Sequence, residues 1–77
     1  QIAAIGNEFD ATKKIKYSEK SFSTFCFNNG KHIATFSINR PADIFISKKI
    51  LSKGSMLSQA DLNKKGFDFK VFAKKHL

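Results

Sequence analysis

Two runs of residues that favour β-strands flank the dipeptide Asn29-Gly30, and this feature constrains the fold more than any other. The first run covers residues 21–28 and the second covers residues 31–38. Asn-Gly is typical of a two-residue hairpin turn, because both central positions require a positive φ. The sequence therefore predicts an antiparallel β-hairpin over residues 21–38, and we expect a mainly β fold.

The register of this hairpin decides which side chains enter the core. A two-residue turn places Phe27 opposite His32. Uninterrupted pairing then brings Phe25 opposite Ala34. The predicted core face consists of Phe25, Phe27, Ala34, Phe36 and Ile38. The opposite, half-covered face carries Phe22, Thr24, Cys26, Ile33, Thr35 and Ser37. Cys26 and His32 then point to opposite faces, which excludes them as a nucleophile and its base.

The rest of the chain predicts further short strands. Residues 12–17 can alternate as a strand with lysines outward. Pro41 ends the second hairpin strand because proline lacks the amide that a sheet ladder uses. Residues 43–47 are predicted to form the next strand. Phe67 and Phe69 alternate with charged residues, which indicates the start of another strand.

A turn and a short helix are predicted between these last two strands. Gly54 tolerates the left-handed conformation that a tight turn requires. The hydroxyl of Ser58 is placed to accept a hydrogen bond from the amide of Asp61, as in a helix N-cap. One helical turn is not stable alone, so packing by Leu57 and Leu62 must hold it in place.

The chain is strongly basic, with 14 lysine and arginine residues against six acidic residues and a net charge of +8. This charge favours an acidic partner. The lysines are scattered, however, which is more typical of solubility and of protected strand edges than of a phosphate track. The nine phenylalanines are needed for a core rather than for stacking on bases. We therefore expect a protein partner and no nucleic acid.

No pattern for catalysis, metal binding or cofactor binding is present in the sequence. The six carboxylates are scattered and form no pair with a histidine or with one another. The isolated His32 and His76 do not make a metal site, and no glycine-rich phosphate loop occurs. The apolar runs are too short to span a membrane. We therefore expect a module that is not an enzyme and that has no cofactor, metal or membrane span.

Residues 43–66 resemble the SAF domain, a β-clip module found in antifreeze-like domains. The segments that carry the resemblance are Asp43–Ile46, Lys49–Gly54, Met56-Leu57 and Gln59–Leu62. Upstream, Cys26 stands just before a polar turn, an arrangement similar to that of the flagellar P-ring formation chaperone family. The resemblance implies a hairpin that leads into a β-clip domain with one short helical turn. Residues 1–42 would then be a strand-rich part and residues 43–77 an incomplete SAF-like domain.

The resemblance also implies a function. Its relatives are periplasmic assembly chaperones, so it implies a binding module that holds flagellar P-ring subunits. The candidate contacts with that partner are Phe45, Lys48, Lys49, Lys53 and Met56. In this family a cysteine outside the present chain would form a disulfide with Cys26.

Three other interpretations stay open. The SAF-like half is equally similar to the corresponding domain of pilus assembly proteins. It is also similar to the sugar-binding antifreeze-like domain of sialic acid synthases, although that likeness does not account for residues 21–38. The positive charge alone would also suit a small nucleic-acid-binding domain.

Overall fold

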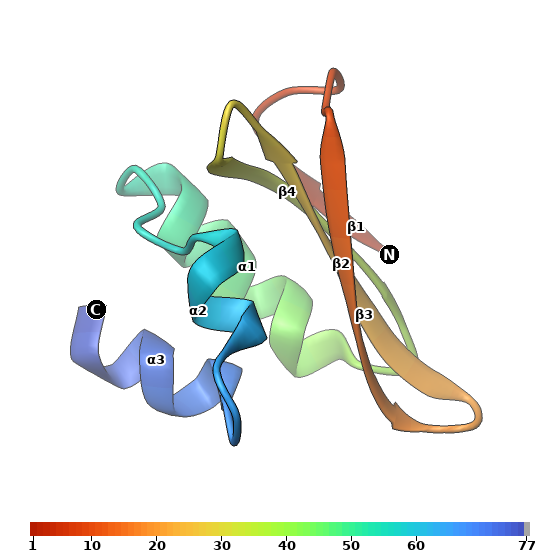
Figure 1. Ribbon diagram of the computed structural model, residues 1–77. Coiled ribbons are helices and arrows are strands. Elements are labelled where there is room, and N and C mark those ends of the chain that lie inside the picture. The colour runs from red at the N-terminus through yellow and green to blue at the C-terminus, as the bar shows by residue number, and fades with distance from the viewer. Residues whose placement is uncertain (77) are drawn as a thin grey trace.

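One antiparallel sheet, covered on one side by three helices, makes up residues 1–76, the part of the chain that this computed structural model describes (Figure 1). The elements in chain order are β1 (Ile2–Ala4), β2 (Ala11–Ser18), β3 (Ser21–Asn28), β4 (Lys31–Ile38), α1 (Pro41–Ser52), α2 (Gln59–Asn63) and α3 (Phe69–His76). The sheet order is β1-β4-β3-β2, so the hairpin strands are central. The predicted β-rich fold with its antiparallel hairpin is confirmed, and β2 confirms the strand predicted over residues 12–17.

The hairpin turn has the conformation that the sequence predicts. Asn29 and Gly30 both have positive φ, at 55° and 79°. Next to the turn, Phe27 pairs with His32, as expected. Phe27 and His32 are fully buried, so the turn directs two large side chains into the protein as it closes the hairpin.

A β-bulge then shifts the pairing of the hairpin by one residue. Beyond Phe27, Cys26 pairs with Ala34 and Phe25 pairs with Thr35. The predicted pairing of Phe25 with Ala34 is therefore wrong, because β4 contains one extra residue at this point. Side chains alternate along a strand, so this shift moves the remaining β4 side chains to the opposite face.

The two faces of the sheet consequently differ from the prediction. We call the face that is turned to the helices the inner face; it carries Ser23, Phe25, Phe27, His32, Thr35 and Ser37. Ala34, Phe36 and Ile38 were predicted to share the core with Phe25 and Phe27, but they lie on the other side, the outer face. Polar side chains of β4 therefore lie under the helices, and apolar ones point away from them.

The helices do not cover the outer face (Figure 1). Apolar side chains gather on this face. Ile2 pairs with Phe36, and the neighbouring rung pairs Phe22 with Ile38. The ring of Phe9 packs edge-on against Phe36, with 6.4 Å between the ring centroids. We call these five residues the outer patch. Ile2 and Ile38 are about half exposed, at 52% and 48%.

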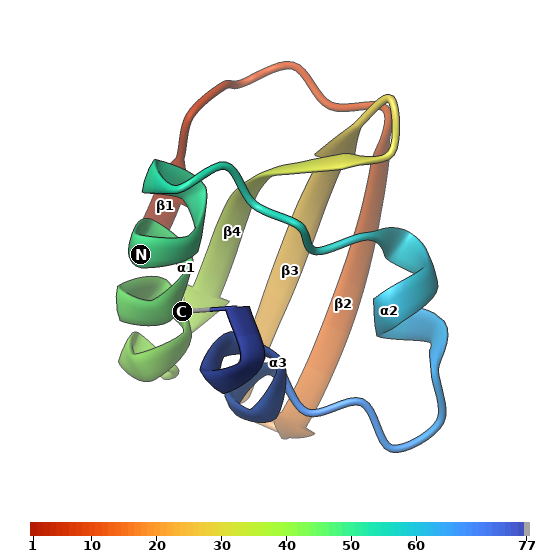
Figure 2. The ribbon, with the colours of Figure 1, turned by 90° about the vertical axis from the view of Figure 1, so that its left-hand side faces the viewer.

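Helix α1 occupies the segment for which a strand over residues 43–47 was predicted, and that prediction is wrong. Pro41 begins the helix, a position where its fixed φ is suitable and its missing amide costs nothing. Ile44, Ser47 and Leu51 are buried at helical spacing. Figure 2 shows α1 in front of β1 and next to β4, and the helix contacts both strands.

The C-terminal segment is helical too. Ser58 and Asp61 form the predicted cap as a reciprocal capping box, which confirms the short helix α2. The strand predicted to start at Phe67 is wrong, because α3 covers Phe69–His76. Asp68 opens that helix, and one of its carboxylate oxygens accepts bonds from the amides of Lys70 and Val71.

The main core lies between the inner face and all three helices. Its buried members are Phe25, Phe27, Ile50, Leu57, Leu62, Phe69 and Ala73. The rings of Phe25 and Phe69 meet edge-on at 4.9 Å between centroids, which ties α3 to the centre of the sheet. A smaller cluster of Ala3, Ile44 and Leu51 holds α1 against β1.

Candidate functional site

The five predicted partner contacts lie on α1 or just after it, and all are exposed. They are Phe45, Lys48, Lys49, Lys53 and Met56. The structure brings two of them together, because the ammonium of Lys49 lies 4.4 Å from the centre of the Phe45 ring. Met56 lies in the segment that leads to α2 and is 72% exposed. Their role in binding stays a prediction.

Cys26 is a free and buried thiol on the outer side of β3. Burial raises the pKa of this thiol, which favours its uncharged and less reactive form. His32 lies on the inner face, so the two side chains are on opposite sides of the sheet, as the sequence predicts. A disulfide from Cys26 to a cysteine outside this chain stays a prediction.

A buried polar cluster connects the sheet to the first turn of α1. At its centre is Asp43, whose side chain is fully buried. Its Oδ2 atom accepts hydrogen bonds from the Tyr17 hydroxyl at 2.6 Å and from the Ser23 hydroxyl at 2.7 Å. Ser23 also shares a 2.7 Å hydrogen bond with Ser37. A buried carboxylate needs such partners, and here three strands and a helix supply or position them.

Arg40 supplies the positive charge of this cluster. Its Nε atom lies 3.6 Å from Oδ1 of Asp43, and its guanidinium carbon lies 3.9 Å from the centre of the Tyr17 ring. Within residues 1–76, the buried Nε atom has no hydrogen-bond partner. Asp43 and Tyr17 therefore fix the position of the guanidinium without satisfying all of its donors.

The same cluster keeps Tyr17 protonated. Burial, followed by the hydrogen bond to Asp43 and the charge of Asp43, raises the pKa of Tyr17 to about 12. Arg40 acts in the opposite direction but does not overcome these effects. Tyr17 is consequently a hydrogen-bond donor to Asp43 over the whole physiological pH range.

His32 is the centre of a second buried polar cluster. Its Nδ1 atom hydrogen-bonds the Ser55 hydroxyl at 2.8 Å, and its Nε2 atom hydrogen-bonds the Thr35 hydroxyl at 2.8 Å. Thr35 in turn accepts a hydrogen bond from Ser47 of α1. Burial lowers the pKa of His32 to about 4, so the ring is neutral near pH 7. This cluster joins β4 to α1 and to the segment before α2.

A pocket of about 300 Å³ opens beside Arg40, between the end of β2 and the start of α3. We call it the Arg40 pocket; its lining is Ile15, Tyr17, Arg40, Phe67, Asp68, Phe69 and Lys70. It is on the helix side of the sheet, because Tyr17 and Ile15 both contact residues of that side. Two cationic side chains and several apolar ones therefore surround the same space.

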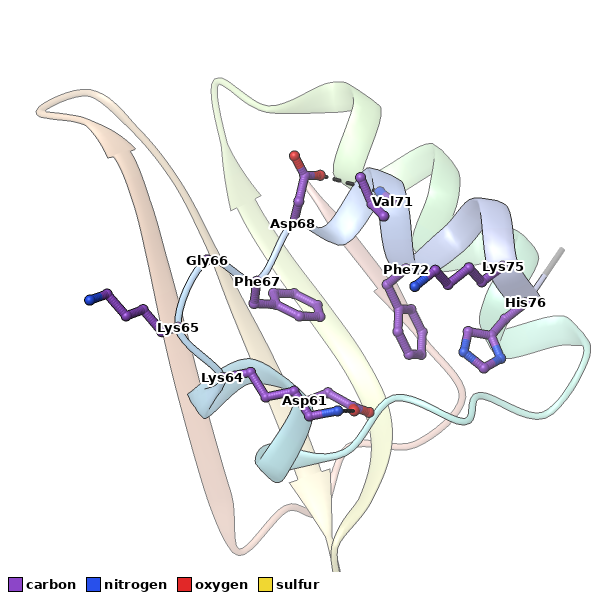
Figure 3. Close-up of a pocket in the computed structure, with 10 residues that line it drawn as sticks. All are labelled: Asp61, Lys64, Lys65, Gly66, Phe67, Asp68, Val71, Phe72, Lys75 and His76. Carbon is purple, nitrogen blue, oxygen red and sulfur yellow. Dashed lines mark hydrogen bonds and ion pairs between the residues drawn. The ribbon is translucent and has the colours of Figure 1, made fainter.

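A second pocket, of about 310 Å³, lies between α2 and α3 (Figure 3). The rings of Phe67 and Phe72 form its walls with 6.1 Å between their centroids, and His76 stacks on Phe72 at 4.3 Å. Phe67 and Asp68 line this pocket as well as the Arg40 pocket. The loop between α2 and α3 therefore separates two adjacent hollows.

Asp61, one of the two acidic residues of the second pocket, is engaged with neighbouring donors. Asp61 accepts bonds from the Ser58 amide and hydroxyl and pairs with Lys64 at 3.4 Å, as the dashed line in Figure 3 indicates. Partial burial tends to raise the pKa of Asp61, but these donors lower it overall. The carboxylate of Asp61 thus stabilises the start of α2.

The sequence interpretation missed the Arg40 pocket. A signal was present, because Arg40 is the only arginine and stands three residues before Asp43. That spacing brings two side chains together at the start of a helix, whereas along a strand they would point to opposite faces. Since residues 43–47 were taken for a strand, the pair was not recognised.

Over residues 1–76, no three of the His, Cys, Asp and Glu side chains come close enough to hold a metal ion. None of the helices in this part of the chain has the length and apolar character needed to cross a membrane.

A family model described as "Reductase C-terminal" matches residues 3–73, which is nearly the whole chain. Neither the curated proteins nor the solved structures contain a match to the chain.

The family match overturns the SAF resemblance. The predicted flagellar chaperone function and the P-ring partner are therefore wrong. The resemblance depended on a short pattern around residues 43–62, where α1 now replaces the first strand of the supposed β-clip. The periplasmic location had the same basis and stays an untested prediction.

Proposed function

We propose that this chain, which belongs to the reductase C-terminal family, serves as the C-terminal domain of a reductase and performs no catalytic step itself. The match over residues 3–73 carries this proposal. The polar clusters add support, since their side chains bond to one another and hold α1 on the sheet. Such bonds favour a structural role for Asp43 and His32 over proton transfer.

The surface through which the domain contacts the rest of the reductase is the outer patch. Phe36 and Ile38 are large apolar side chains that the helices leave exposed. Exposed apolar residues that adjoin one another are typical of a surface that another part of a protein covers. Lysines of β2 border the patch, and the ammonium of Lys14 lies 4.0 Å from the centre of the Phe22 ring. The border is therefore polar, as in interfaces between domains.

Two matched variants of the full-length reductase test this proposal. Ile38→Lys places a charge in the outer patch, and Val71→Lys places the same charge on α3. The parent side chains are equally exposed, at 48% and 50%, so the direct effect on folding of the domain is similar. We expect only Ile38→Lys to speed protease cleavage between this domain and the rest of the enzyme and to lower the melting temperature.

Equal effects of the two variants would contradict docking through the outer patch. A second measurement tests the assignment to a reductase. The full-length protein should oxidise a reduced nicotinamide or an equivalent electron donor, and the 77-residue chain alone should not. Activity of the isolated chain would refute the absence of a catalytic step, and an upstream reading frame unrelated to reductases would refute the proposal as a whole.

A further inference from the structure

We propose that the Arg40 pocket binds an organic oxyanion, namely a carboxylate or phosphate attached to a small apolar group. The inference begins with the guanidinium of Arg40. This group presents N–H donors in a planar fork that matches the oxygens of carboxylates and phosphates. Its contact with Asp43 is 3.6 Å long, and the buried Nε atom makes no hydrogen bond within residues 1–76. That Nε atom faces Oδ1 of Asp43, so an anion in the pocket is bound by the Nη donors of Arg40, whose side chain is 30% exposed.

The arginine is held in place before any ligand binds. Tyr17 lies against the guanidinium plane, and its hydroxyl is bonded to Asp43, which Ser23 also holds. A side chain fixed by such contacts loses little conformational entropy on binding. Tyr17 and Asp43 are accordingly positioning residues, and the direct contact with the anion comes from Arg40.

Lys70 supplies a second positive charge to the pocket from the first turn of α3. Its side chain forms no ion pair within residues 1–76, so it is free to turn toward an anion. Between the two cations, Ile15, Phe67 and Phe69 provide apolar wall. This combination suits a ligand with one anionic end and one apolar end better than it suits a free inorganic ion.

Asp68 is the one carboxylate in the lining, and its charge opposes an anion. Its Oδ1 atom is engaged with the amides of Lys70 and Val71, at 2.9 and 3.3 Å. Asn caps helices about as well as Asp does. The variant Asp68→Asn therefore removes the opposing charge and keeps the start of α3 intact.

This pocket and the outer patch lie on opposite sides of the sheet. Ligand binding at Arg40 therefore does not depend on how the domain docks onto the rest of a reductase. The two proposals fail or succeed separately.

Titrations of the ¹⁵N-labelled 77-residue chain, followed by amide NMR spectra, test the proposal. The probes are benzoate and phenyl phosphate, with benzyl alcohol as a neutral control and inorganic phosphate as an anion without an apolar part. We expect the two organic anions to shift the amides of residues 67–70 and 15–17, and benzyl alcohol to leave them unchanged. Inorganic phosphate should bind more weakly than phenyl phosphate.

Three variants test how each charged side chain of the pocket affects the affinity for phenyl phosphate. Lys70→Gln should weaken binding up to about fivefold, as expected for an exposed charge pair. Arg40→Lys should weaken it about tenfold, because it keeps the charge and removes the planar fork. Asp68→Asn should tighten it. Lys31→Gln, at the hairpin turn, removes the same charge far from the pocket and should have no effect.

Some outcomes would overturn the proposal. Shifts of the same residues by benzyl alcohol would show that the anion is not recognised. Equal affinities for inorganic phosphate and phenyl phosphate would show that the apolar wall of the pocket does not contribute to binding. The amide dispersion of Arg40→Lys shows whether this variant is folded. If it is unfolded, the affinities of Lys70→Gln and Asp68→Asn test the site instead. Equal affinities of these two variants and the parent chain would refute the site.

Discussion

The Tyr17 hydroxyl donates a 2.6 Å hydrogen bond to Oδ2 of Asp43, and this contact joins the edge strand β2 to the first turn of α1. The two residues are 26 positions apart in the sequence. Asp43 is fully buried, while Tyr17 is 38% exposed. The hydroxyl of Tyr17 therefore stabilises the buried carboxylate of Asp43, and Tyr17 also forms part of the lining of the Arg40 pocket.

The ionisation of Tyr17 should be shifted to high pH. Its pKa is raised to about 12, so the folded protein resists loss of the phenolic proton. This stabilising contribution is complete below pH 10, the pKa of an unfolded tyrosine, and disappears between pH 10 and about 12. Tyr17 is the only tyrosine, so the ultraviolet absorbance of phenolate measures it directly. A midpoint near pH 10 in the folded chain would contradict the bond to Asp43.

Removal of the Tyr17 hydroxyl should destabilise the fold. The variant Tyr17→Phe keeps the ring against Arg40 but takes one donor away from the buried Asp43. A buried acceptor that loses a partner typically costs about 1–3 kcal/mol in the free energy of unfolding. Urea denaturation measures this change. The matched control is Ser21→Ala, which removes an exposed hydroxyl that bonds the Asn39 carbonyl, and its cost should be smaller.

Acid should weaken the fold through His32. The pKa of this histidine falls to about 4 in the folded chain, against about 6.5 when it is exposed. The unfolded chain therefore takes up a proton between these values and the folded chain does not. Stability contributed by neutral His32 is complete above pH 6.5 and is lost as the pH falls to about 4. The loss is on the order of 3 kcal/mol.

Urea denaturation at pH 7 and at pH 4 tests this dependence on His32. In the variant His32→Gln the ring is absent, so the difference in unfolding free energy between the two pH values should shrink. The variant is less stable at pH 7, since Ser55 and Thr35 lose their partner. If the parent and the variant lose equal stability on acidification, other groups cause the effect.

Cys26 should be protected from thiol reagents in the native protein. Its side chain is 1% exposed, and burial raises the pKa of the thiol. Reagents modify the thiolate, so little of the reactive form is both present and accessible near neutral pH. Modification should be slow in buffer and complete in denaturant, as measured by intact mass. Rapid modification of the folded chain would show that β3 opens readily.

Local signals in the sequence predicted part of the fold correctly. Asn29-Gly30 specified the hairpin, because few other residue pairs accept two positive φ values. Ser58 and Asp61 specified the cap of α2, because their bonds involve atoms only three residues apart. Both features depend on short stretches of chain and are independent of distant contacts.

Features that depend on distant contacts were not predicted. Residues 43–47 have the apolar β-branched character of a strand, yet β4 and β1 supply a surface on which they pack as a helix. No residue near Phe27 or His32 in the sequence indicates that β4 contains a β-bulge. The Arg40 pocket also depends on distant contacts, since its lining comes from β2, from the residue before α1, and from α3 with the loop that precedes it.

The extra residue in β4 sets the orientation of every later side chain in that strand. Without it, Phe36 and Ile38 would turn inward, and Thr35 and Ser37 would turn to the solvent. Phe36 and Ile38 would then add to the core, and the hydroxyl groups of Thr35 and Ser37 would take their place on the outer face. With the extra residue, the hydroxyl groups of Thr35 and Ser37 are buried and the side chains of Phe36 and Ile38 are exposed. One extra residue in β4 thus supplies the exposed apolar side chains through which we propose that the domain docks.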